Sequence, residues 1–106
     1  MNITWQPEGM TETKRILAIQ ILLERHPHLL HFLFRPDRLE LKAEPAELLC
    51  AAGGFSHGAI VLILIALDLW CDEGGASLTE AAEVLDTDNW GQFMKALIVF
   101  GGGDGQ

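Results

Sequence analysis

The stretch Ser56–Cys71, which reads SHGAIVLILIALDLWC, decides the fold of this protein. Within it, Ala59–Leu67 includes no polar side chain, and Asp68 alone interrupts the apolar run that continues to Trp70. A helix that is apolar on every side must be covered on every side, which places this helix at the centre of the fold. A membrane could supply the cover, but a spanning helix needs about 20 apolar residues and this run is shorter.

The two ends of the stretch are typical of a helix in a globular fold. Ser56 can cap the N-terminal amides, and Gly74 and Gly75 are stop signals beyond the C-terminal end. A buried pair of strands is the alternative, since isoleucine and valine favour strands. The length of the run and the capping residues favour a helix. We therefore predict a buried central helix, with Leu64 among its buried side chains.

The flanking sequence predicts further helices from their capping and stop signals. They run from Thr11–Thr13 to about His26, from Pro27 to about Phe34, from Glu44–Glu47 to Gly53, from Ser77 to Leu85, and from Asp86–Asn89 to Gly101. Residues 39–42 alternate in polarity, as a short strand or an extended linker would. A lone strand has no evident partner, so we favour a linker or a single helical turn. In the last helix, one apolar face is predicted to pack on the core: Trp90, Phe93, Met94, Leu97 and Ile98.

These elements predict an all-α fold, a single-domain compact bundle of five or six helices around the buried central helix. The domain spans residues 1–106, with an irregular N-terminal lead-in at 1–10 and a mobile glycine-rich tail at 101–106. The N-terminal sequence lacks the basic-then-apolar pattern of a signal peptide, so we expect a cytoplasmic protein.

Charge is divided unequally along the chain. Residues 1–42 hold six basic and five acidic side chains, whereas residues 43–106 hold only Lys95 against ten acids, giving +1 and −9 of the total −8. The ten acids are Glu44, Glu47, Asp68, Asp72, Glu73, Glu80, Glu83, Asp86, Asp88 and Asp104. An acidic half repels nucleic acid and attracts basic protein surfaces. The alternative is that these charges only keep an apolar chain in solution.

No residue pattern predicts catalysis, a cofactor or a bound metal. His26, His28, His31 and His57 do not combine with a Cys-x-x-Cys pair into a zinc set, and Cys50 and Cys71 are expected to be buried, inert thiols. The run that begins at Asp86 imitates the start of a calcium loop but has Leu97 where a bidentate glutamate is required. We therefore expect a non-enzymatic protein, with a small enzyme as the least favoured class.

Residues 78–100 also have the outline of a helix-turn-helix. The two helices carry Lys95 as their only basic side chain, so we expect no binding of duplex DNA. A helix-turn-helix-like regulator or an antitoxin-type adaptor remains the alternative function. A basic stripe on the folded surface would favour the regulator, formed by Lys14, Arg15, Arg25, Arg35 and Arg38.

The run FSHGAIVLILIALDLWCDEGGASLTEAAEVLDTDNWGQFMKALIVFGG, together with chain size and the acidic second half, resembles small acidic helical anti-CRISPR proteins of phages and mobile elements. Those proteins inhibit type I CRISPR-Cas systems. The resemblance implies an inhibitor in the host bacterial cytoplasm that covers a basic, nucleic-acid-handling surface of the complex or its nuclease. It assigns no functional residue.

Four acids close together are the candidate partner-binding residues: Glu80, Glu83, Asp86 and Asp88. Helix capping accounts for one or two of them, and like charges at one helix end destabilise it unless something offsets them. A basic partner surface could provide that offset, so we predict that this cluster faces the partner.

Overall fold

The apolar run forms helix α4 (His57–Cys71) in a computed structural model that describes residues 10–37 and 40–101. Its buried side chains point to several sides of the helix: Val61, Leu62, Ile63, Ile65, Ala66, Leu67 and Leu69. The Ser56 hydroxyl accepts a hydrogen bond from the Ala59 N–H at 3.2 Å, as the capping signal predicts. The prediction of a buried central helix is confirmed.

One stripe of α4 is less covered than the rest. Ile60, Leu64, Asp68 and Cys71 follow one another at helical spacing and are all half-buried. The prediction that Leu64 is buried is therefore wrong. Because α4 is apolar on every side, its sequence could not show which side the other helices leave partly open.

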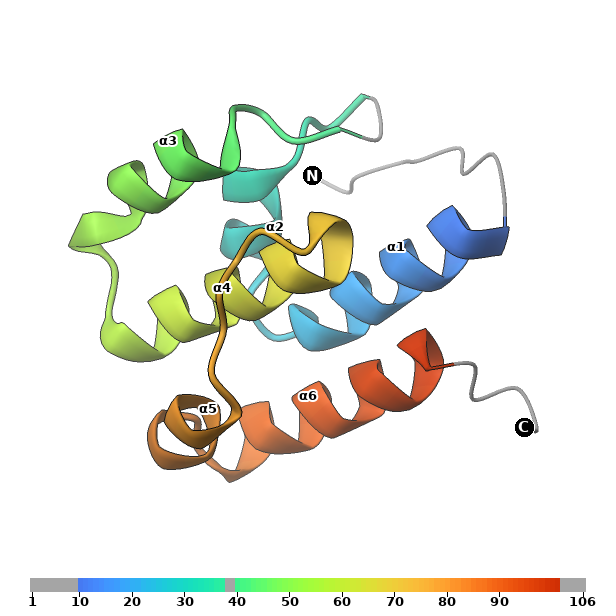
Figure 1. Cartoon of the computed structure of the whole chain (residues 1–106), viewed down its shortest axis with the longest axis vertical. Coiled ribbons are helices and arrows are strands. Elements are labelled where there is room, and N and C mark those ends of the chain that lie inside the picture. Colours follow the sequence, from blue (N-terminus) through green and yellow to red (C-terminus); the bar gives the residue numbers. More distant parts are fainter. Residues whose placement is uncertain (1–9, 38–39, 102–106) are drawn as a thin grey trace.

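The other helices surround α4 (Figure 1). They are α1 (Met10–Leu22), α2 (Pro27–Leu33), α3 (Pro45–Ala51), α5 (Leu78–Val84) and α6 (Thr87–Phe100), with a 3-10 turn at Ala52–Gly54 after α3. Helices α1, α2, α3 and α5 all contact α4, and α1 also packs extensively along α6. The radius of gyration, 13.0 Å, is that of one domain of about 100 residues. The protein is an all-α, single-domain bundle.

The helix limits differ slightly from those predicted. Helix α1 starts at Met10, so the irregular lead-in does not include this residue, and it ends at Leu22 because the chain turns before Pro27. Gly101 follows α6 as its C-cap. The remainder of the predicted lead-in, residues 1–9, and of the predicted tail, residues 102–106, lie outside the described residues.

Of the predicted linker 39–42, residue 39 lies outside the described residues, and residues 40–42 have a partner that the sequence did not reveal. Leu41 pairs with Phe34 in an isolated antiparallel bridge. The Lys42 N–H donates to the Leu33 carbonyl at 2.9 Å, and the Arg35 N–H donates to the Glu40 carbonyl at 3.0 Å. The chain therefore folds back on the end of α2 before it enters α3.

Helix α6 does not turn its whole apolar stripe to the core. Phe93 is buried, but Leu97 is 36% exposed and Ile98 is 61% exposed, so the prediction is wrong at the last two positions. The buried face runs instead through Gln92 and Ala96. The reason is that α6 packs along α1 at the side of the bundle, so the covered face is narrower than the apolar face.

Asp68 holds the loop that leads from α4 to α5. Its Oδ1 accepts the N–H groups of Gly74 at 2.8 Å and Gly75 at 2.9 Å, and its Oδ2 accepts that of Ala76 at 2.7 Å. An ionised carboxylate forms stronger hydrogen bonds with backbone amides than a neutral acceptor does. Asp68 therefore interrupts the apolar run for a structural reason, since it ties the loop before α5 to α4.

Replacing Asp68 with asparagine is expected to destabilise the protein by about 1.5–3 kcal/mol, because an amide has one acceptor oxygen for three N–H donors and no charge. The control is Asp72→Asn. Asp72 is exposed, and its φ of 61° is a conformation that asparagine tolerates, so a change below about 0.5 kcal/mol is expected. Urea unfolding followed by circular dichroism measures both. Equal stability of the two variants would contradict the role assigned to Asp68.

Candidate functional site

The four candidate carboxylates lie on α5 and at the start of α6. Ser77 starts α5 by accepting the Glu80 N–H at 3.2 Å, which places Glu80 and Glu83 one turn apart on this helix. Asp86 starts α6 by accepting the Asn89 N–H at 2.8 Å. Glu83, Asp86 and Asp88 are exposed and Glu80 is half-buried, so short-range capping brings the cluster to the surface.

Three of the four acids have partners within the protein. The Glu80 carboxylate lies 2.8 Å from His57 Nε2, and Asp88 Oδ2 lies 3.4 Å from an Arg25 guanidinium nitrogen. Asp86 is engaged in the helix cap. Glu83 has no hydrogen bond or ion pair within the described ranges. Internal groups thus offset part of the repulsion that, in the sequence, argued for an external partner.

A polar contact set joins the start of α6 to the turn between α1 and α2. His26 Nε2 and Asn89 Oδ1 are 2.9 Å apart. The buried Gln92 donates from Nε2 to the Ile21 carbonyl at 2.6 Å and to Glu24 at 3.1 Å. No signal in the sequence marked this role of Gln92, because a single glutamine beside Phe93 in an amphipathic helix is not unusual. These contacts fix the orientation of α6 and of the acids at its start.

Two of the basic residues of the first half, Arg25 and Arg35, form ion pairs with acids, and Arg38 lies outside the described residues. Arg25 lies beside Asp88, and Arg35 Nε lies 3.1 Å from Glu40. Arg15 lines a surface cavity with Asp68 and Asp72, and its Nε is buried without a hydrogen-bond partner among the described residues. Ion pairs between exposed side chains contribute less than about 1 kcal/mol each, but they place a negative charge beside two of the five residues of the predicted basic stripe.

The histidines and cysteines are dispersed. His26 and His28 have ring centroids 5.9 Å apart, but no group of three or more histidine, cysteine or acidic side chains is placed to hold a metal within 10–37 and 40–101. Cys50 is exposed, so its predicted burial is wrong: it lies on the side of α3 away from the buried Leu48. Burial raises the pKa of the half-buried Cys71 thiol, and Glu73 nearby raises it further, so this thiol remains protonated at neutral pH.

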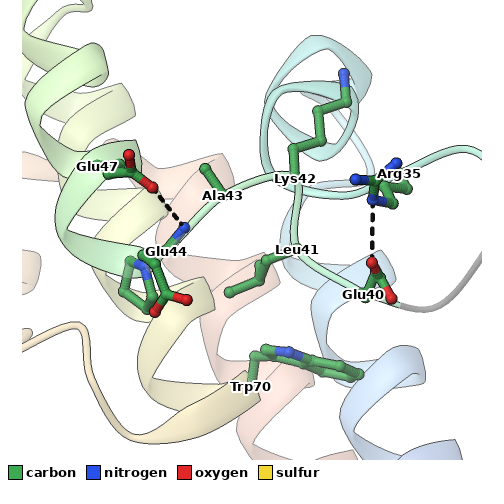
Figure 2. A pocket seen from close by; sticks show the side chains of 9 residues that line it. Arg35, Glu40, Leu41, Lys42, Ala43, Glu44, Glu47 and Trp70 are labelled. Carbon is green, nitrogen blue, oxygen red and sulfur yellow. Dashed lines mark hydrogen bonds and ion pairs between the residues drawn. The ribbon is translucent and has the colours of Figure 1, made fainter.

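A cavity of about 460 Å³ lies between the Phe34–Leu41 bridge and α3 (Figure 2). Trp70 forms its floor below Leu41, and its ring packs edge-on to Phe34 with centroids 5.3 Å apart. Two contacts hold charged side chains of its wall: Glu47 accepts the backbone N–H of Glu44 at 3.3 Å, and Arg35 pairs with Glu40. The described residues that line the cavity include no serine, cysteine or histidine.

None of the helices in the described part of the chain is both long enough and apolar enough to cross a membrane. Comparisons of the chain with protein-family models, with curated proteins and with solved structures found no match. The function of this protein is therefore inferred from its own sequence, charge and surface.

Proposed function

We propose that this protein is a non-enzymatic inhibitor that binds a basic protein surface through its acidic face. The carrying observation is the exposure of Glu83, Asp86 and Asp88 on a surface where α5 and α6 carry a single basic side chain, Lys95. Charges of one sign raise the rate of encounter with a complementary surface and disfavour partners of the same sign.

The resemblance to small acidic anti-CRISPR proteins makes a component of a type I CRISPR-Cas system the first partner to test. Its complexes and nucleases handle nucleic acid through basic surfaces, which are the complement of this acidic one. Occupying such a surface requires no reaction and no cofactor. On this proposal, the protein acts in the cytoplasm of a bacterial host.

The helix-turn-helix alternative has less support. Helices α5 and α6 do follow one another closely, but α6, the helix that would read DNA, packs along α1. Lys95 is the only basic residue among its exposed side chains, and Arg25 lies beside Asp88 at its start. Phosphate contacts supply most of the affinity in DNA binding, so we expect the protein not to bind duplex DNA at submicromolar concentrations.

Reversing Glu83 and Asp88 together to lysine is expected to abolish most of the inhibition of the type I system whose basic surface this protein covers. The association rate should also lose most of its salt dependence, because electrostatic steering is removed. The fold should persist, since Glu83 has no described partner and the Asp88–Arg25 pair is exposed. Phage plating on a CRISPR-immune host and binding kinetics at two salt concentrations measure the effect.

Two single reversals provide a matched control. Glu83→Lys and Asp37→Lys each change the net charge from −8 to −6, and both positions are exposed. Only Glu83→Lys should weaken inhibition if the α5–α6 surface binds the partner. If the double reversal inhibits as well as the parent protein, or if Asp37→Lys has the same effect as Glu83→Lys, the cluster is only a solvated face. Tight, salt-dependent binding of duplex DNA would support the regulator instead.

A further inference from the structure

An apolar groove opens where α4, α6 and the start of α5 meet. Ile65 and Leu69 of α4 and Phe93 of α6 line it, and all three are buried. Leu78 and Leu97 also line the groove, and both remain exposed, at 68% and 36%. Leu78 begins α5, where an exposed leucine contributes nothing to helix capping. The groove therefore presents apolar side chains from three helices at the surface.

The loop that Asp68 binds forms one side of the groove. Ala76 and Ser77 line the groove, and the Ala76 N–H donates to Asp68 at 2.7 Å. Its volume is about 140 Å³, close to that of apolar cavities of about 150 Å³ that accept a benzene ring. It is thus large enough for one aliphatic or aromatic side chain.

The surroundings of the groove select the charge of what binds there. All residues that line the groove lie between Ile65 and Phe100, and this range holds one basic residue, Lys95. Of the seven acids in this range, Asp68 lines the groove itself. Asp72 and Glu73 are exposed in the loop that leads to Ala76. Arg15 lines the neighbouring cavity beyond Leu69, together with Asp72.

We infer that this groove binds a basic segment of the partner protein that inserts one large aliphatic or aromatic side chain between Leu78 and Leu97. The inserted side chain leaves water for the apolar surface of Ile65, Leu69 and Phe93, and lysine or arginine residues that flank it lie near Asp72 and Glu73 of the loop. This inference rests on the proposed function and specifies its partner: a segment that is both basic and apolar, rather than a basic surface alone.

Two labelled peptides test the inference by fluorescence anisotropy with the full chain. One contains lysine and leucine in helical spacing, and the other has alanine in place of each leucine. The lysine–leucine peptide is expected to bind, more weakly as salt rises, and at least about tenfold more tightly than the lysine–alanine peptide.

Neighbouring residues of α6 supply a matched pair of variants. Leu97 lines the groove, whereas Ile98 is more exposed and does not. Leu97→Ser should weaken binding of the lysine–leucine peptide about tenfold, and Ile98→Ser should leave it unchanged. Leu78→Ser, at the most exposed leucine of the groove, should act like Leu97→Ser and serves as the test if Leu97→Ser fails to fold.

The outcomes separate this inference from the proposed function. Absence of lysine–leucine binding, or equal losses in Leu97→Ser and Ile98→Ser, overturns the inference. If both peptides bind equally and in a salt-dependent manner, the groove is not used, while the acidic surface still binds basic chains. A concentration-dependent dimer that Leu97→Ser dissociates would show that a second copy of the chain occupies the groove, and would also overturn it.

Discussion

Replacing Gly74 with alanine is expected to destabilise the protein by about 3–4 kcal/mol. A Cβ atom at this position would overlap the carbonyl oxygen of Leu64 and would lie 2.9 Å from its carbonyl carbon and 3.0 Å from the Asp68 nitrogen. Overpacking usually costs about 1–3 kcal/mol when side chains can move aside, but these atoms are backbone of the central helix and cannot. The loop would have to leave α4, which would also stretch its hydrogen bonds to Asp68.

Gly91→Ala is the matched control for this variant. Gly91 lies inside α6, and a Cβ there meets no atom within 4 Å. Alanine favours the helix, so this variant should gain up to about 1 kcal/mol. Urea unfolding of both variants gives the comparison. A Gly74→Ala protein that unfolds at the same urea concentration as the parent would show that the loop does not need its close approach to α4.

Leu67→Ala is expected to cost about 2–5 kcal/mol, and Leu64→Ala distinctly less. Leu67 is fully buried, so its truncation removes apolar contacts and leaves a cavity. Leu64 lies one turn earlier in the same helix and is half-buried, so the surface there can close over the gap or admit water. The same leucine-to-alanine change in the interior of one helix makes differences in helix propensity cancel.

Chemical denaturation of the two leucine variants, analysed with a common slope, measures the difference directly. Equal losses would mean that α4 is covered equally on both sides, and a larger loss for Leu64→Ala would mean that the half-exposed stripe of α4 is misplaced. Leu62→Ala, at another fully buried position of α4, should behave like Leu67→Ala.

Short-range signals in the sequence were sufficient for the elements themselves. The length and composition of the apolar run predict α4, and the capping positions of Ser56, Ser77 and Asp86 are confirmed by hydrogen bonds to residues three positions later. Such contacts are local, because a helix start is decided by side chains within one turn. The acidic cluster was likewise visible from spacing alone, and its role in partner binding stays a prediction.

The tertiary structure decided which side of each helix is covered and which charges meet. Glu80 lies beside His57, and Asp88 beside Arg25, across 23 and 63 positions of the chain. Leu64, Leu67 and Leu97 are equally apolar in the sequence. Only the packing of the other helices makes Leu67 a core residue and leaves Leu97 at a groove. The physical reason is that helix formation depends on neighbours in sequence, whereas burial and charge pairing depend on neighbours in space.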